Sequence, residues 1–132
     1  MRRVLLSMAA TLAMFITGTA AYAHHSYAAT YDVTKEVTLS GKLVQFVYRN
    51  PHSFVHITVA DEKGVQQRWA VEWSGTTQLS AQGVNRESLK VGDDVVINAR
   101  PSRVTGEYRA LMIKLKRTSD GFSWGSPGQT VD

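Results

Sequence analysis

The chain has 132 residues, with 15 Lys and Arg against 11 Asp and Glu, and it contains no cysteine. This length suits one small domain with one core. The lack of cysteine excludes disulfides, thiolate metal sites and cysteine nucleophiles, so the burial of apolar side chains has to stabilise the fold.

The first 23 residues have the features of a secretory signal peptide. Arg2 and Arg3 form a charged start, an apolar run too short to span a bilayer follows, and small residues stand at Ala21 and Ala23. We expect cleavage after Ala23 and a mature protein in the periplasm or outside the cell, without a membrane anchor. Loss of the two arginines lowers the net charge from +4 to +2. With its scattered basic residues, the mature chain is not expected to bind nucleic acid.

The first predicted strand is long. Apolar side chains alternate with polar ones from Val37 to Val47, which is typical of a half-buried strand, and Gly41 indicates a bulge or bend in its middle. The turn Asn50-Pro51 follows, because proline cannot donate a backbone hydrogen bond to a sheet. A second strand is predicted from Ser53 to Ala60. The expected core positions of the first strand are Val37, Leu39, Leu43 and Val47, and those of the second are Val55, Ile57 and Val59.

The turn Asp61-Glu62-Lys63-Gly64 joins the second strand to a third, from Val65 to Trp73. A two-residue loop would pair odd-numbered residues with even-numbered ones and put the two apolar sets on opposite faces. We therefore predict a bulge at Gly64, or an equivalent offset by one residue, that restores the register. The third strand would then bury Val65, Trp69, Val71 and Trp73 and present Gln66, Arg68 and Glu72 outward.

The period changes after the third strand. Thr76 to Gln82 is expected to form a short helix that ends at Gly83, and Asn85 is expected to cap a second turn. A fourth strand, from Asp94 to Arg100, would place Val95, Ile97 and Ala99 on one face.

The fifth predicted strand runs from Glu107 to Arg117 and buries Leu111, Ile113 and Leu115. From Thr118 on the chain has no period, so residues 118–132 are expected to form a flexible tail. Its aromatic residues, Phe122 and Trp124, are expected to fold back over an open end of the fold.

Three strands, a short helix and two further strands are the element order of a five-stranded Greek-key barrel of the OB kind. The predicted fold class is therefore all-β with one short helix, and the alternative is another small β-barrel or sandwich. The expected organisation is a signal peptide at 1–23, an N-terminal segment with a histidine pair at 24–35, an OB-like barrel at 36–117 and the tail.

Cleavage after Ala23 would leave His24 as the first residue, with an α-amine and an imidazole that can chelate one ion through two nitrogens. The amine has an ordinary pKa of about 7.7 to 8.0 and the imidazole of about 6.5, so a metal displaces few protons near neutral pH. Nitrogen-rich sites favour Cu(II) among the divalent first-row ions. An imidazole from His25, or from His52 beside the Asn-Pro turn, would complete a site made of His24, His25 and His52.

The same histidines can also have roles that involve no metal. The processed terminus can be solvated, or stacked on Tyr27 or Tyr31, and His52 can be a turn residue bonded to a carbonyl. If cleavage follows Ala21 instead, His24 becomes the third residue, and a free terminus then offers Cu(II) a different geometry.

A second candidate site is an exposed face of the second and third strands, which would bind a protein or a glycan without metal. Its residues are Phe54, His56, Arg68 and Glu72. Arg68 and Glu72 lie four residues apart on one face and are expected to pair, whereas the favoured interpretation of His56 is a solvated cross-strand partner. His52 and His56 would lie about 13 Å apart on an extended strand, too far to share one metal ion.

We expect a binding module and not an enzyme. Ser53 follows His52 directly, but neighbouring residues of a strand point to opposite faces, so the two cannot act as nucleophile and base. Glu72 has no visible catalytic partner, which ranks a hydrolase last.

Four motifs cover most of the mature chain: HHSYAATYD from residue 24, VTLSGKLVQFVYRNPHSFVHITVAD from residue 37, WAVEW from residue 69 and LKVGDDVVINARPSR from residue 89. Together they resemble a family of small exported bacterial proteins of unknown function, whose members begin with His-His-Ser after the signal and carry an Asn-Pro-His turn. The resemblance implies a secreted OB-like or related small barrel, with no established activity. Family members typically continue with a Gly-Ser-Pro-Asn-like segment after the Trp-x-Val-Glu strand, whereas this chain has Ser74-Gly75-Thr76-Thr77 there. The matching family residues, to which the resemblance assigns no role, are His24, His25, Ser26, Asn50, Pro51, His52, Trp69 and Glu72.

Overall fold

The computed structural model describes residues 27–125. Residues 27–30 form a helical turn in a first unit that ends at Thr30, and a second unit begins at Tyr31. The expected signal peptide and the histidine pair lie outside the described residues. Among the described helices, none has the length and apolar character needed to cross a membrane.

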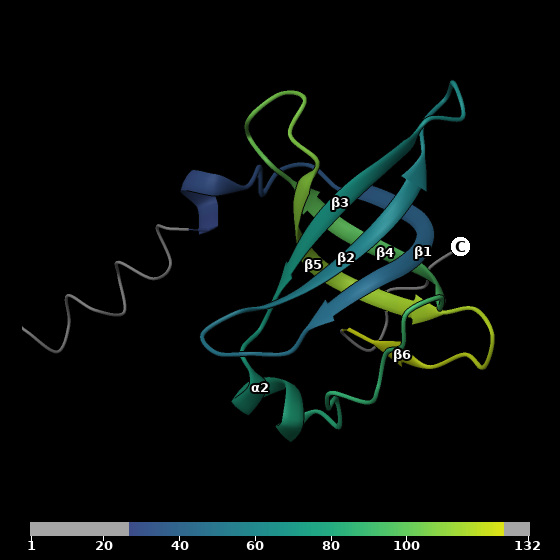
Figure 1. Cartoon of the computed structure of the whole chain (residues 1–132). Coiled ribbons are helices and arrows are strands. Elements are labelled where there is room, and N and C mark those ends of the chain that lie inside the picture. The colour runs from purple at the N-terminus through teal and green to yellow at the C-terminus, as the bar shows by residue number, and fades with distance from the viewer. Residues whose placement is uncertain (1–26, 126–132) are drawn as a thin grey trace, which may run out of the picture. The chain divides into compact units, whose positions relative to one another are not determined.

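The second unit is a closed barrel with an added strand (Figure 1). The sheet order is β3-β2-β1-β4-β5-β6, and a parallel pairing of β3 with β5 closes the five strands β1 to β5. This order is that of a small OB-like barrel, so the predicted fold class is confirmed. In chain order the elements are β1 (Val37–Val47), β2 (Ser53–Ala60), β3 (Gln66–Trp73), α2 (Thr76–Ala81), β4 (Asp94–Pro101), β5 (Arg109–Arg117) and β6 (Ser123–Trp124).

β1 is long because it pairs with two different strands. Residues 37–42 pair with β4 and residues 42–47 pair with β2, and Figure 1 shows the strand curving between them. Gly41 stands where the partner changes. A Cβ at Gly41 would lie 2.2 Å from the backbone oxygen of Thr58, so only glycine fits at this bend.

The bulge in β1 lies at Val44 and not at Gly41, because the register with β2 shifts between Leu43 and Gln45. A bulge reverses which residues face the core. The expectation that Val47 lies in the core is therefore wrong, and Phe46 packs against the core instead.

The β2–β3 hairpin keeps its two apolar sets on one face, as the sequence predicts. Val55 pairs with Val71, and every other pair also joins residues of equal parity. The Asp61 N–H donates to the Val65 carbonyl, and the loop between them ends at Gly64 with a φ of 78°. Such a three-residue loop supplies the predicted offset. Val65 itself is 53% exposed, because the strand begins one residue later than expected.

β5 contains a second bulge. Asn98 of β4 pairs with Lys114, but the next residue, Ala99, pairs with Met112, which leaves Ile113 as the extra residue. This bulge is the physical reason for two differences from the sequence analysis.

The first difference concerns the core. Leu111 and Ile113 are only partly buried, and Ala110 and Met112 take the inward positions before the bulge. Only Leu115, beyond the bulge, is buried as predicted. The second difference concerns Arg109, which the sequence analysis did not place: alternation without a bulge would put it inside with Leu111, but it points to the outer face.

The chain returns to the barrel after β5. β6 pairs with β5, and the indole of Trp124 contacts that of Trp73 edge to face, with ring centres 4.9 Å apart. Phe122 and Trp124 both pack against the core. Residues 118–125 of the expected flexible tail therefore form a turn and a strand, and residues 126–132 lie outside the described residues.

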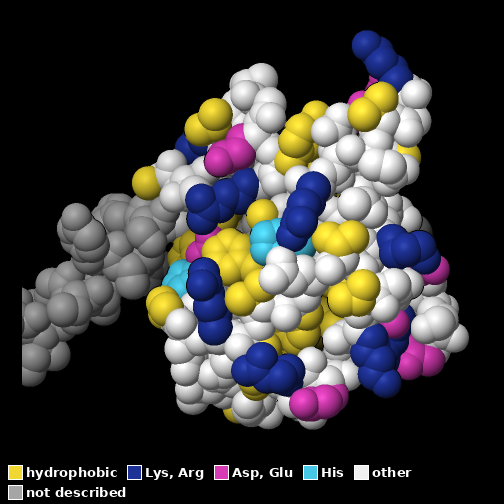
Figure 2. Space-filling view, in the orientation of Figure 1, with side chains coloured by type: hydrophobic (Ala, Val, Ile, Leu, Met, Phe, Trp, Pro, Cys, Tyr) yellow, Lys and Arg dark blue, Asp and Glu magenta, His cyan; other side chains and the backbone are white. Residues whose placement is uncertain are grey.

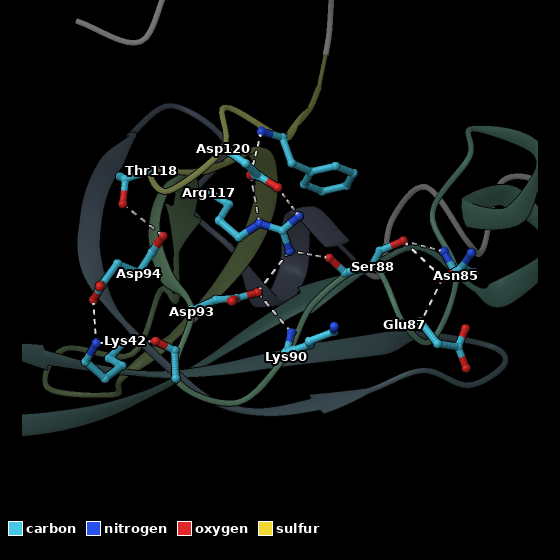
Figure 3. Close-up of polar contacts among 12 residues, drawn as sticks. Lys42, Asn85, Glu87, Ser88, Lys90, Asp93, Asp94, Arg117, Thr118 and Asp120 are labelled. Carbon is cyan, nitrogen blue, oxygen red and sulfur yellow. Dashed lines mark hydrogen bonds and ion pairs between the residues drawn. The ribbon is translucent and has the colours of Figure 1, made fainter.

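Arg117 ties this C-terminal turn to the loop before β4 (Figure 3). Its guanidinium donates to the carboxylate of Asp93 at 3.0 Å, to that of Asp120 at 2.8 Å and to the carbonyl of Ser88 at 2.6 Å. The hydrogen bond from Arg117 lowers the pKa of Asp120 to about 2. The ionised pair thus fastens the end of β5 to a neighbouring loop.

Candidate functional site

A buried carboxylate on β3 connects four segments of the chain. Glu72 is 6% exposed. The Tyr31 hydroxyl donates to Glu72 Oε2, and Arg109 Nη2 donates to the same oxygen at 3.0 Å. His52 Nδ1 is hydrogen-bonded to Oε1, and Arg109 Nε donates to the Tyr31 oxygen at 2.9 Å. These four residues are referred to below as the Glu72 cluster.

The turn between β1 and β2 positions His52. Ser53 Oγ donates to the Arg49 carbonyl at 3.1 Å and accepts the Arg49 N–H at 3.2 Å, which closes the turn across its base. Asn50 Oδ1 accepts the backbone N–H of Thr76 at 2.8 Å, so the turn is also fastened to the start of α2. Two independent sets of hydrogen bonds therefore hold the backbone that carries His52.

Arg109 and Tyr31 reach the cluster from opposite ends of the sequence. Arg109 pairs with Ala70 in the parallel β3–β5 contact, and the bulge in β5 turns its side chain toward the outer face. Tyr31 precedes β1 and forms an isolated bridge with Ser102, just after β4. The β3–β5 pairing and the bulge in β5 thus bring Arg109 to the carboxylate, and the path of the chain before β1 brings Tyr31.

The cluster is an ionised, fully hydrogen-bonded network. Burial raises the pKa of Glu72, but hydrogen bonds from Tyr31, Arg109 and His52 outweigh it and leave this pKa below its ordinary value. An ionised carboxylate only accepts hydrogen bonds. Nδ1 of His52 therefore carries a hydrogen and donates a hydrogen bond to Glu72. Burial and the contact with Glu72 raise the pKa of Tyr31, which stays a neutral phenol.

A histidine whose Nδ1–H is held by a carboxylate is typical of metal sites. The carboxylate fixes the tautomer and the ring orientation and increases the basicity of the imidazole. The side chain of His52 is 33% exposed, and in metal sites of this kind the ligand is the other ring nitrogen, here Nε2. The same pair can act as a general base, but Ser53, the neighbouring hydroxyl, is fully buried on the opposite face of β2.

The structure joins two residues that the sequence analysis assigned to different sites. His52, an expected metal ligand, is hydrogen-bonded to Glu72, an expected member of the exposed face. Glu72 is buried, so its place on that exposed face is a wrong prediction. The predicted pairing of Glu72 with Arg68 is also wrong, because Arg109 is its partner.

Arg109 and Tyr31 were missed as site residues. The available signal was that a charged residue, Arg109, falls on the face that alternation assigns to the core, which indicates a break in the alternation. No comparable signal marks Tyr31, since its contact depends on the path of the chain before β1.

Phe54 and His56 point outward from β2, as predicted. Their rings are 6.3 Å apart and nearly parallel, at 21°. Arg68 donates from Nη2 to Gln45 Oε1 at 3.0 Å on the same face. Burial and the charge of Arg68 lower the pKa of His56. In Figure 2, histidine, basic and apolar side chains gather on this face over β2 and β3.

Within residues 27–125, no three or more His, Cys, Asp or Glu side chains are grouped so that they could hold a metal ion. His24 and His25 lie outside the described residues. Of the three expected ligands, His52 is therefore the one whose surroundings are known.

Comparisons with known proteins identify a family. No curated protein matches the chain. Among solved structures, the crystal structure of the mitochondrial single-stranded DNA-binding protein of S. cerevisiae is similar, with a TM-score of 0.48 and 11% sequence identity over 66% of this chain and 96% of that chain. Residues 12–110, which include the whole Glu72 cluster, match a family described as being of unknown function. The chain therefore belongs to this family of unknown function, DUF6152.

Proposed function

We propose that the protein is an exported, non-enzymatic metal-binding module that holds Cu(II) through His24, His25 and His52. The observation that carries this proposal is the hydrogen bond between His52 Nδ1 and the buried carboxylate of Glu72. Carboxylate–histidine pairs of this kind orient imidazoles that ligate metals. The signal sequence supports export to the periplasm.

The Glu72 cluster contains one expected ligand, His52, and a residue close in sequence to the other two, Tyr31. Tyr31 and His52 are bonded to the two oxygens of one carboxylate. His25 precedes Tyr31 by six residues, and an extended chain of that length spans up to about 20 Å. The proposal therefore requires that His24 and His25 lie no farther from Tyr31 than this length of chain allows.

The donor set determines the choice of metal. A terminal amine and imidazoles supply only nitrogen, and the chain has no cysteine to offer a thiolate. Nitrogen donors suit Cu(II) best among the divalent first-row ions, and hard ions such as Mg²⁺ prefer oxygen.

The test is a calorimetric titration of Cu(II) into the mature protein, whose start at His24 is verified by intact mass. We expect His24→Ala and His52→Ala each to weaken binding, and Glu72→Gln to weaken it about tenfold by removing the group that orients His52. His56→Ala is the matched control. It also removes an imidazole, but His56 lies on the outer face of β2 and is not part of the Glu72 cluster. Equal affinity in the wild type, His24→Ala and His52→Ala would rule out the proposed site.

A further inference from the structure

Arg49, Phe54, His56 and Arg68 lie near one another on the outer face of the barrel and are referred to below as the basic row. The guanidinium of Arg49 lies 5.5 Å from the centre of the Phe54 ring. Phe54 is stacked beside His56, and the charge of Arg68 acts on His56 from β3. Arg49, Phe54 and His56 therefore follow one another along the outer face, and Arg68 is bonded to Gln45, the residue of β1 that pairs with His56.

The basic row carries positive charge that the described residues do not neutralise. Arg49 Nε donates to the backbone carbonyl of His52 at 3.4 Å, and Arg68 donates to the amide oxygen of Gln45. Neither arginine takes part in an ion pair within residues 27–125. Glu72 pairs with Phe54 across the strands, but its carboxylate is buried and bonded to Arg109. The row therefore complements a ligand that brings its own carboxylates.

The side-chain types favour a protein as that ligand. Arginine and aromatic residues are enriched at the centres of protein interfaces, and lysine is depleted there. The basic row has two arginines, a phenylalanine and no lysine. Single-stranded nucleic acid is bound by aromatic faces on which bases stack, whereas the Phe54 ring is already in contact with Arg49 and His56.

We propose that the basic row binds an acidic surface of a partner protein, independently of any metal. Arg49 and Arg68 donate paired N–H groups to carboxylates, a geometry that the guanidinium fork fits better than an ammonium group. Phe54 supplies apolar contact between the two charges. Both arginines are exposed, so they can be replaced without opening the core.

The experiment uses fluorescently labelled poly-L-glutamate as the probe, with the mature protein and EDTA present. We expect the double variant Arg49→Gln, Arg68→Gln to bind about tenfold more weakly than the wild type, which corresponds to about 1.4 kcal/mol. The matched control is Lys63→Gln, Lys116→Gln, which removes the same charge from two exposed positions outside the row and should change the affinity less than about twofold.

Three results would overturn the proposal. They are no binding of poly-L-glutamate by the wild type, an equal loss in the arginine and lysine variants, and tighter binding of polygalacturonate or oligo-dT at equal charge. The last result would assign the row to a glycan or a nucleic acid. Cu(II) titration of the single variant Arg68→Gln separates this proposal from the metal site, because Arg68 is bonded to Gln45 and not to the turn that carries His52, so its copper affinity should equal that of the wild type.

Discussion

Glu72 is a charged side chain removed from water by the barrel around it. Burying a carboxylate costs several kcal/mol unless hydrogen bonds and opposite charges compensate. Here a phenol, an imidazole and a guanidinium all donate to its two oxygens. The cluster therefore stabilises the fold only when all of its four residues are present. This contribution does not depend on a ligand at His52.

Glu72→Gln tests this at the residue scale. The amide keeps the shape but loses the charge, and it places an N–H group among three donors. We expect the free energy of unfolding to fall by about 2 kcal/mol, measured by urea denaturation near neutral pH.

The control for Glu72→Gln is Glu87→Gln, a change at an exposed acid in the loop before β4. A surface substitution of this kind should stay within about 0.5 kcal/mol of the wild type. If both variants lose the same small amount, the cluster does not stabilise the fold.

Much at the residue scale was predictable. The outward positions of Phe54 and His56 follow from the period of two along a strand, because successive side chains alternate between faces. The partner of Glu72 was not predictable from Arg68, four residues away, since it comes from β5 and depends on pairing between distant strands. Local spacing on one strand carries no information about the neighbouring strand.

At the scale of the elements, two bulges decide which side chains face the core. The bulge at Val44 exchanges Val47 for Phe46, and the bulge at Ile113 exchanges Leu111 for Met112. Each is one extra residue in one strand, which the pattern of that strand alone does not locate. The hairpin at Gly64 was predictable because both of its strands and its turn are adjacent in the sequence.

β6 provides a test of the C-terminal strand. Trp124→Ala removes the edge-to-face contact with Trp73 and uncovers part of the core. Because Trp124 is only partly buried, we expect a loss of about 2 kcal/mol in the free energy of unfolding, below the range for fully buried tryptophan. Ser123→Ala, an exposed neighbour on the same strand, is the control in urea denaturation. An unchanged midpoint for Trp124→Ala would show that β6 does not stabilise the barrel.

The ion pair between Arg117 and Asp120 makes the stability of the fold depend on pH (Figure 3). The pKa of Asp120 falls from an ordinary 3.8 to about 2 in the folded protein. A lowered folded-state pKa stabilises the fold at pH values above 3.8, and this contribution disappears as the pH falls through about 2.

The variant Asp120→Asn measures this contribution. Its melting temperature should lie below that of the wild type at pH 5, and the difference should shrink toward pH 2 because the wild-type carboxylate becomes protonated. Glu62→Gln serves as a control for the loss of an exposed acid elsewhere, in the β2–β3 turn. A constant difference across this pH range would contradict the assignment of the effect to ionised Asp120.

At the scale of the whole molecule, one hydrophobic core stabilises the barrel, and no disulfide contributes. The core cluster draws on all five barrel strands and on the region of α2, and its fully buried members include Val55, Ile57, Val71, Leu79, Ile97 and Leu115. A continuous core of this kind unfolds as one unit in most small domains.

We therefore expect the metal-free mature protein to unfold in a single transition. Tryptophan fluorescence, which reports on β3 and β6, and far-ultraviolet circular dichroism, which reports on all strands, should give the same midpoint in urea. A reducing agent should leave that midpoint unchanged, because the chain has no cysteine. Separate midpoints for the two signals would show that the C-terminal strand or the barrel closure unfolds independently.

By itself, the sequence determined the positions of the five barrel strands and the short helix. It also determined the OB-like order of these elements and the outward positions of Phe54 and His56 on β2. These features follow from local alternation and turn residues, which act between neighbours in the chain. Only the tertiary structure decided that Tyr31, His52, Glu72 and Arg109 meet. Glu72 is 41, 20 and 37 positions from its three partners, and their contact requires barrel closure and the bulge in β5. The candidate site thus arises where distant strands pair, and no local pattern encodes that pairing.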